Sequence, residues 1–358
     1  MKEKQIISGE QLQSRVISFL RFPLCAAVVL IHININTKAC LTHPLYDSVH
    51  YFCAQIIARV AVPLFFMFSG FLFFYKSEEF TFSSYKGKLT KRIRTLLIPY
   101  LFWNCTLILY YLVGRLFGLG SQYGEGFGFI NWLRPFWNNY PIEFNGEGIA
   151  SYPICVQFWY IRDLMVTVLL SPVIYWLIKK CRIYLIMTLA TLWITNLWPL
   201  ITGFNITALF FFSLGAYCSI FKKNFAEILK PHTLLLGVAY LLTIVLVLIM
   251  LDTKFNPLRR IGILFGMAFT ISLTARYISK GLWNTNKFLS ESSFFVFAYH
   301  VTAIFIIEDI VSLFFNTDIM CTMLYIVKAG VIVIVGLALY YLLKKWMPRF
   351  TSLITGGR

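Results

Sequence analysis

The chain has 358 residues, of which 59% are apolar and 13% are charged, and its formal net charge is +17. A typical soluble domain is about 45–50% apolar and about 25% charged, so this composition excludes a cytosolic enzyme, a secreted disulfide scaffold and a disordered chain. The apolar runs are continuous rather than alternating, which argues against a β-barrel. We therefore expect an all-α, polytopic integral membrane protein that forms one domain over residues 1–358.

A membrane-spanning helix needs about 20 mostly apolar residues, and the chain holds about ten such segments. They cover residues 17–36, 51–75, 95–117, 157–178, 183–201, 205–221, 232–251, 261–279, 290–315 and 321–343. The stretch 118–156 is expected to be a loop on the outer side. Its many aromatic residues suit either an interfacial anchor or a platform for an acceptor such as a sugar.

The basic residues are distributed unevenly between the two sides of the expected bundle. Most of the 32 Lys and Arg residues fall in segments on the same side as the N-terminus. Cytoplasmic loops are enriched in Lys and Arg, so both termini are expected in the cytoplasm. The short loop with Lys254, Arg259 and Arg260 is the one discordant segment. Because topology explains the charge, and no basic recognition helix is evident, nucleic acid is not an expected partner.

The eight cysteines are scattered singly along the chain, mostly within apolar runs, and no Cys-x-x-Cys pair occurs. We interpret them as small buried apolar residues rather than as a disulfide or zinc framework. No spacing of Cys and His indicates a metal site. Neither a metal nor a resident cofactor is therefore expected.

The first expected span carries two titratable residues, Arg21 and His32, with ten residues between them. Three helical turns take up about 10.8 residues, so the two side chains should project from one face, about 16 Å apart along the axis. Such groups inside a membrane span are costly and mark either function or a buried partner. Histidine is the side chain best suited to general-base chemistry near neutral pH, although a hydrogen-bonded core histidine is the alternative.

Further candidates lie in the second span and in the loop that follows it. Arg59 lies in an apolar run, where it either serves the site or forms a structural ion pair, for example with Asp163. Pro63 can free a backbone carbonyl, and Ser69-Gly70 can allow two helices to approach closely. The loop basic residues Lys86, Lys88, Lys91, Arg92 and Arg94 could bind phosphates of a nucleotide-bearing donor or could reflect topology and contact with anionic lipid.

The fourth and ninth spans contribute the last candidates. The fourth span opens with Trp159, Arg162 and Asp163. Neighbouring residues on a helix do not face each other, so Arg162 and Asp163 are each expected to pair with another span. His300 is a second intramembrane histidine, with a structural and a functional role equally open.

Taken in order, these residues resemble the signature of the acyltransferase-3 family of membrane-bound acyltransferases. The matching pieces are Arg21 with His32, Val62-Pro63-Leu64-Phe65-Phe66 with Ser69-Gly70, Lys91 with Arg94 before Pro99-Tyr100, Phe158-Trp159-Tyr160-Ile161-Arg162-Asp163-Leu164, and Ser293-Phe294 with Tyr299-His300. Some glycan-modifying members carry a Glu-containing motif after the tryptophan of the fourth span. Here Arg162-Asp163 stands there and resembles a different branch.

The resemblance implies a bacterial cell-membrane enzyme that transfers an acyl group, usually acetyl, from cytoplasmic acyl-CoA to a hydroxyl of an extracytoplasmic or lipid-linked glycan. It implies His32 as general base, Arg21 as the residue that steers the donor, and Lys91, Arg92 and Arg94 as phosphate ligands. Supporting roles would fall to Arg59, Trp159, Arg162, Asp163 and His300. The expected partners are acyl-CoA, the acceptor and membrane lipids. The alternative is a transporter or flippase for a lipid-linked glycan or a small anion, which would use the same buried charges along its pathway.

Overall fold

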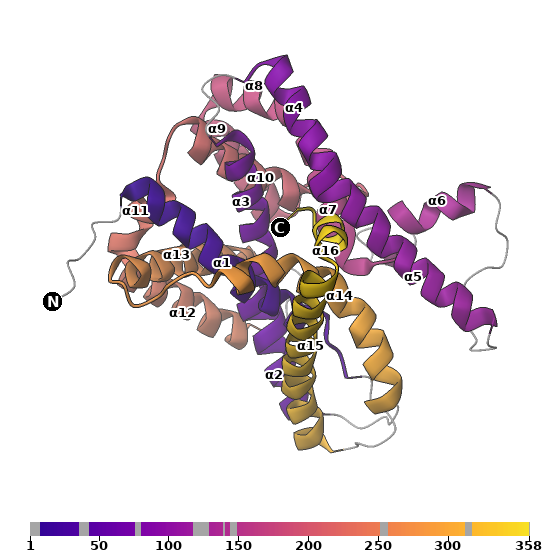
Figure 1. Ribbon diagram of the computed structural model, residues 1–358. Helices are drawn as coiled ribbons and strands as arrows, with labels where there is room; N and C mark the ends of the chain where they lie inside the picture. The colour runs from indigo at the N-terminus through magenta and orange to yellow at the C-terminus, as the bar shows by residue number, and fades with distance from the viewer. Residues whose placement is uncertain are drawn as a thin grey trace.

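The computed structural model (Figure 1) describes most of the chain. The described residues are 8–35, 43–75, 80–116, 129–138, 140–143, 149–250, 257–311 and 317–357. Their architecture is helical, as expected, apart from one antiparallel hairpin in which Tyr140–Glu143 (β1) pairs with Ile149–Tyr152 (β2). This hairpin lies within the expected outer loop 118–156, and sequence analysis does not predict it.

The N-terminal part of the chain forms helices with two irregular stretches. Helix α1 begins after Ser8, whose hydroxyl accepts a hydrogen bond from the Gln11 amide (3.4 Å) and caps the helix. The irregular turns precede Pro63 and Pro99, because proline lacks an amide proton and clashes with the carbonyl four residues earlier. The elements are α1 (Gly9–His32), α2 (Pro44–His50), the π-turn η1 (Tyr51–Ile57), the 3-10 turn η2 (Ala58–Val60), α3 (Ala61–Phe74), α4 (Phe82–Arg92), the π-turn η3 (Ile93–Leu97) and α5 (Ile98–Leu116).

The rest of the chain adds the hairpin and eleven more helices. They are α6 (Phe129–Trp137), α7 (Trp159–Leu169) after the 3-10 turn η4 (Val156–Phe158), α8 (Ser171–Cys181), α9 (Ile183–Thr195), α10 (Ile206–Ile220), α11 (Phe225–Leu229), α12 (Thr233–Ile249) after the 3-10 turn η5 (Lys230–His232), α13 (Pro257–Ser279), α14 (Lys287–Val311), α15 (Asp318–Trp346) and α16 (Pro348–Ile354). Figure 1 shows α4 and α5 as one long diagonal run, with α2 beside α15.

Each of the ten expected spans coincides with a helix or a helical run, but not all of these match a full membrane crossing. Among the described residues, six runs are long and apolar enough to cross a membrane, and a seventh is a pair bent by 65°, Val156–Leu169 with Ser171–Cys181. Helices α9 and α10 have only 13 and 15 residues, fewer than the roughly 20 that a perpendicular crossing needs. The chain is therefore a multi-pass membrane protein.

The core is built around α3, most of whose side chains are buried, and α3 packs most extensively on α10. Two glycines make this contact possible. A Cβ atom at Gly70 would overlap the carbonyl oxygen of Phe212, and one at Gly215 would overlap that of Met67. The close approach expected from Ser69-Gly70 is thus confirmed, and it takes a glycine from each helix.

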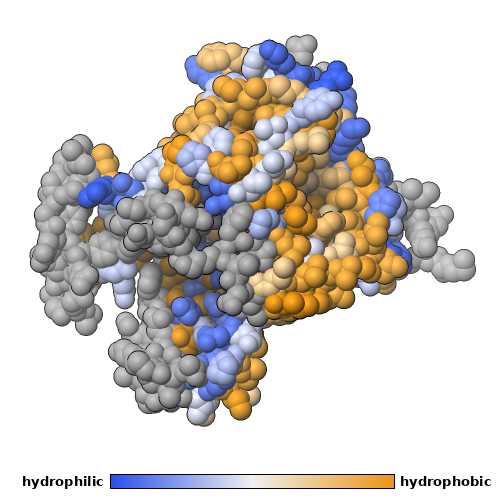
Figure 2. Space-filling model, turned by 180° about the vertical axis from the view of Figure 1, so that it is seen from behind, coloured by the Kyte–Doolittle hydropathy of each residue, from blue (hydrophilic) through white to orange (hydrophobic). Residues whose placement is uncertain are grey.

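The outer surface is largely apolar. Figure 2 shows hydrophobic residues over a broad area of one face. Helix α12 alone leaves Leu234, Leu235 and Ile249 more than two-thirds exposed, at 77%, 67% and 74%. Apolar side chains exposed at this density would be a liability in water and suit contact with lipid.

Candidate active site

Helix α1 positions both residues of the Arg21–His32 pair. Its buried residues, which include Leu20, Leu24 and Val28, pack into the bundle, mainly against α14, α13 and α3. Arg21 is half-buried and lines two cavities. The span expected at 17–36 ends earlier than predicted: His32 is the last residue of α1 and lies at the helix end.

His32 contacts His300 of α14. The ring centroids are 5.1 Å apart and the ring planes are inclined by 61°. His32 Nδ1 lies 2.9 Å from the Val28 carbonyl oxygen, and His300 Nδ1 lies 2.6 Å from the Phe297 carbonyl oxygen. A carbonyl oxygen can only accept, so both Nδ1 atoms carry the proton. Each neutral ring then keeps an Nε2 lone pair with which it can take up a proton.

The histidine pair also lies beside the half-buried cation Arg59. The Arg59 guanidinium donates to Gln55 Oε1, with an Nε to Oε1 distance of 2.9 Å. It lies close enough to His32 to act on it electrostatically. Asp163, the acid considered as its partner, binds Arg162 instead. Arg59 thus brings positive charge to the histidines from the irregular turn before Pro63.

Two cavities meet at Arg21. The first, here called the Lys222 cavity, has a volume of about 740 Å³ and is lined by residues of α1, the end of α3 and the turn between α10 and α11. The second, the Arg92 cavity, has a volume of about 330 Å³ and is bordered by Arg92, Thr95 and Phe297. Both cavities share Ile17, Arg21 and Leu72, so Arg21 stands in their common wall.

The C-terminal segment closes one side of the Arg92 cavity. The Trp103 indole donates to the Ile354 carbonyl (3.1 Å) and fixes the end of α16. Gly356 follows with a φ of +71°, and a Cβ there would overlap the Thr95 carbonyl oxygen. Gly356 and Gly357 therefore form part of the cavity wall, a role that sequence analysis does not assign to them.

Of the three phosphate ligands expected in the basic loop, the structure brings one to a cavity. Arg92 lines the Arg92 cavity and packs 5.7 Å from the Phe73 ring centroid. Lys91 and Arg94 are exposed and line neither cavity. Lys88 turns inward and lies over the rings of Phe73 and two neighbouring phenylalanines.

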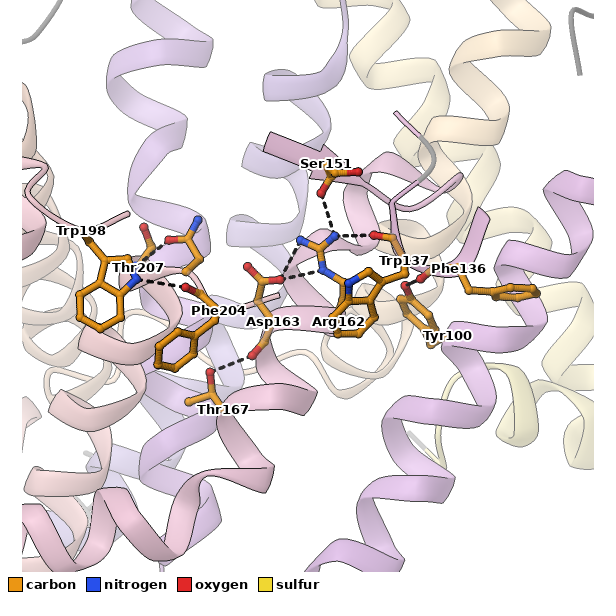
Figure 3. A network of polar contacts seen from close by, with 11 residues as sticks. Tyr100, Phe136, Trp137, Ser151, Arg162, Asp163, Thr167, Trp198, Phe204 and Thr207 are labelled. Atoms are coloured by element: carbon orange, nitrogen blue, oxygen red, sulfur yellow. Dashed lines mark hydrogen bonds and ion pairs between the residues drawn. The ribbon is translucent and has the colours of Figure 1, made fainter. Parts of the chain in front are cut away.

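Arg162 and Asp163 pair with each other, which corrects the expectation that each would pair with another span (Figure 3). Arg162 Nη2 lies 2.9 Å from Asp163 Oδ1, and Nε binds the same oxygen at 2.9 Å. The Arg162 side chain folds back onto its sequence neighbour in the first turns of α7. Its Nη1 then donates to the carbonyls of Trp137 (2.7 Å) and Ser151 (2.8 Å), which ties α7 to the hairpin segment.

The same pair borders a third, smaller cavity of about 170 Å³, here called the Arg162 pocket. Its lining combines polar groups with aromatic rings: Ser151, Tyr152, Trp159, Arg162, Asp163, Asn196, Trp198, Asn205, Thr207 and Arg260. Burial raises the pKa of the Tyr152 phenol, while the nearby Arg59 and Arg162 act in the opposite direction. Arg59 therefore acts electrostatically on a residue of this pocket and on the histidine pair.

Sequence analysis misses Arg260. The Arg260 Nη2 donates to Asn196 Oδ1 (2.6 Å), and its Nη1 donates to the Trp193 carbonyl. The sequence holds one signal for Arg260. Its loop carries several basic residues, although the loop is expected on the outer side of the membrane, where Lys and Arg should be few. Arg260 is half-buried and forms part of the wall of the Arg162 pocket.

Comparisons with known proteins identify the family of the chain. The profile of the acyltransferase domain family (Acyl_transf_3) matches residues 16–345. Among curated proteins, the succinoglycan biosynthesis protein ExoH of Rhizobium meliloti (strain 1021) is 28% identical over 216 residues, which are 58% of this chain and 54% of that protein. The match thus spans about half the length of that relative. No solved structure matches the chain. The chain belongs to the acyltransferase-3 family of membrane-bound acyltransferases.

Proposed function

We propose that this protein is an O-acyltransferase of the bacterial cell membrane that transfers an acyl group, acetyl in the simplest case, from cytoplasmic acyl-CoA to a glycan hydroxyl. The observation that carries the proposal is the contact between His32 and His300. Both rings keep a free Nε2, and the helix that ends at His32 carries Arg21 in the wall of two cavities.

The three cavities suggest how the two substrates approach the histidines. The Lys222 and Arg92 cavities contain Arg21 and Arg92, which suit the phosphates of a CoA thioester. The Arg162 pocket combines tryptophan rings with amide, hydroxyl and carboxylate groups, which suits a sugar. The relative in Rhizobium meliloti is a succinoglycan biosynthesis protein, which supports a polysaccharide or its lipid-linked precursor as the acceptor.

His32 is the general base in the proposed acyl transfer. Its Nε2 removes the proton from the acceptor hydroxyl as the oxygen attacks the thioester carbonyl. The new C–O bond forms, the C–S bond breaks, and the imidazolium returns the proton to the CoA sulfur, so ester and free thiol leave together. Arg59 supplies positive charge beside the oxyanion that develops at the carbonyl, and Nδ1 of His32 stays bound to the Val28 carbonyl throughout.

The test is transfer of labelled acetyl from acetyl-CoA to glycan by the purified full-length protein in lipid nanodiscs. Glycans from cells that lack the gene serve as the acceptor, and longer CoA thioesters are compared to fix the acyl chain. Wild-type protein should release free CoA thiol and label the glycan in equal amounts. Failure to bind any acyl-CoA, or transport of the acceptor without acylation, would refute the proposal in favour of a carrier.

A further inference from the structure

The Lys222 cavity is larger than the Arg92 cavity and the Arg162 pocket, and the catalytic proposal uses only Arg21 of its walls. At about 740 Å³ it lies within the range of about 300–1,000 Å³ typical of small-molecule sites. The neighbouring Arg92 cavity, at about 330 Å³, is less than half as large. A bulky ligand group therefore fits the Lys222 cavity better.

The turn that carries Lys222 is held by both neighbouring helices. The Lys222 amide donates to the Ser219 carbonyl (3.2 Å), and the Lys223 amide donates to the Cys218 carbonyl (2.7 Å). Asn224 then caps α11 by accepting from the Glu227 amide (3.1 Å). The turn is thus fixed in position, with both lysines exposed to solvent and in the lining of the cavity.

Lys222 adopts a left-handed backbone conformation, with φ of +51°. Glycine is the usual residue at such a position after a helix, and a lysine there is strained. The fold has a left-handed turn here but places a charged side chain on it. A residue held against its backbone preference at a cavity wall is a candidate for function.

Charge and aromatic groups in the cavity together fit a phosphorylated nucleotide. Arg21, Lys222 and Lys223 line it with Glu10 as the acidic residue, so the lining carries a net positive charge. No hydrogen bond or ion pair to Arg21 is found within the described part of the chain. Phe71, Phe74 and Tyr75 also border the space, and a purine base can stack on aromatic rings of this kind.

We propose that the Lys222 cavity binds the 3′-phosphoadenosine end of the CoA donor, with Lys222 and Lys223 as ligands of the 3′-phosphate. This inference rests on the proposed function. Arg21, in the wall common to both cavities, marks the passage into the Arg92 cavity. There the pantetheine arm lies among Phe65, Phe68 and Phe297. Neither histidine lines this cavity, but the Phe297 carbonyl binds His300, so the arm runs along the helix that carries His300.

The experiment compares CoA with dephospho-CoA, which lacks only the 3′-phosphate. Equilibrium binding to the purified full-length protein is measured by calorimetry at low and at moderate salt. The test variant is Lys222→Gly/Lys223→Ala, in which glycine suits the left-handed backbone, so that charge is lost without new strain. Wild-type protein should prefer CoA by about tenfold or more, as expected when charge-assisted contacts are present, and this preference should weaken as salt rises.

In the test variant, CoA affinity should fall to that of dephospho-CoA, whose own affinity should stay the same. The matched control, Lys280→Ala/Lys345→Ala, removes the same charge from two exposed lysines outside the cavities and should keep the preference. The inference is overturned if wild-type protein binds both ligands equally. It is also overturned if Lys91→Ala/Arg94→Ala abolishes the preference while the test variant retains it. Absence of any CoA binding would instead overturn the proposed function itself.

Discussion

The two imidazoles that touch in the core differ in their surroundings. His300 is fully buried, and its Nε2 has no hydrogen-bond partner among the described residues. His32 is only half-buried, at the end of its helix, and Arg59 acts on it electrostatically. An acceptor hydroxyl can therefore reach His32 more readily. We assign the proton transfer to His32 and a supporting role to His300.

This difference predicts distinct effects of three substitutions. His32→Ala should lower turnover by about 10²–10⁴-fold, the usual effect of losing a general base, and leave CoA affinity nearly intact. His300→Ala should lower turnover less, because the base itself remains. Arg21→Ala should weaken CoA binding as well as turnover, because Arg21 lines both donor cavities. Steady-state transfer kinetics and calorimetry separate these effects, and near wild-type turnover in purified His32→Ala would exclude the mechanism.

A second prediction concerns the buried pair Arg162–Asp163, whose side chains are 4% and 1% exposed. Arg162→Ala leaves the Asp163 carboxylate buried and unpaired, and it also frees the carbonyls of Trp137 and Ser151. Removal of one partner of a buried pair costs about 3–5 kcal/mol. We expect a clearly lower thermal-unfolding midpoint in detergent.

The control for this prediction is the exposed pair Lys344–Glu291. Lys344→Ala should change the midpoint little, because exposed pairs contribute about 0–1 kcal/mol. Equal effects of Arg162→Ala and Lys344→Ala would show that the Arg162 network does not hold α7 to the hairpin segment.

At the residue scale, the sequence predicts the relative positions of side chains on one helix. It does not predict the positions of side chains that turns between helices bring together. The helical repeat relates Arg21 to His32, and α1 spans both. Lys222 owes its place to a left-handed turn, and Arg260 to its bonds with α9 and the residue that follows it. Neither arrangement follows from a local pattern, because each depends on the path of the chain between helices.

At the level of elements, two prolines shape the site. The π- and 3-10 turns η1 and η2 come before Pro63, and the π-turn η3 comes before Pro99. The first pair of turns carries Arg59, and η3 carries Thr95 at the wall of the Arg92 cavity. Irregular helical turns of this kind are common at functional sites. Here η2 contains Arg59, and η3 directly follows Arg92.

The contact between α3 and α10 yields the third prediction. Gly215→Ala would place a methyl group against the Met67 carbonyl and force the two helices apart. Overpacking of a well-packed core costs about 1–3 kcal/mol. The expected result is a lower unfolding midpoint together with reduced turnover, because α3 borders both donor cavities.

Gly330 provides the matched control within α15, because a Cβ there would meet nothing within 4 Å. Gly330→Ala should leave the midpoint unchanged or slightly higher, since alanine favours a helix more than glycine does. If Gly215→Ala were equally harmless, the two helices would not be packed backbone to backbone.

Hydropathy located the helices but not all of their ends. The apolar run suggested a first span from residue 17, whereas α1 begins at Gly9, because Ser8 caps a polar turn that hydropathy does not detect. The strands of the hairpin have four residues each and lie in an aromatic segment, so no alternating pattern distinguished them. The 65° bend between α7 and α8 was equally hidden, because the apolar run continues across it.

For the whole molecule, the proposed direction of transfer depends on orientation. The expected arrangement puts both termini and the basic loop in the cytoplasm and residues 118–156 outside. If it is correct, Lys86→Cys on α4 should react with a membrane-impermeant maleimide only after cells are broken. Asn138→Cys, after α6, should react in intact cells. Both positions are exposed.

Exposed native cysteines would also react with the maleimide and give a background signal. Cys105 is exposed, whereas Cys25, Cys155, Cys218 and Cys321 are buried, so Cys105→Ser should come first. Labelling of Lys86→Cys in intact cells would place the basic loop outside. The donor would then have to be something other than cytoplasmic acyl-CoA.

The wall formed by Gly356 and Gly357 has a practical use. A small environment-sensitive dye coupled next to Gly357, which is exposed and has open space around it, would sit at the rim of the Arg92 cavity. Its emission should change when the pantetheine arm displaces water from that space. Donor occupancy could then be followed optically, in real time and without any knowledge of the acceptor.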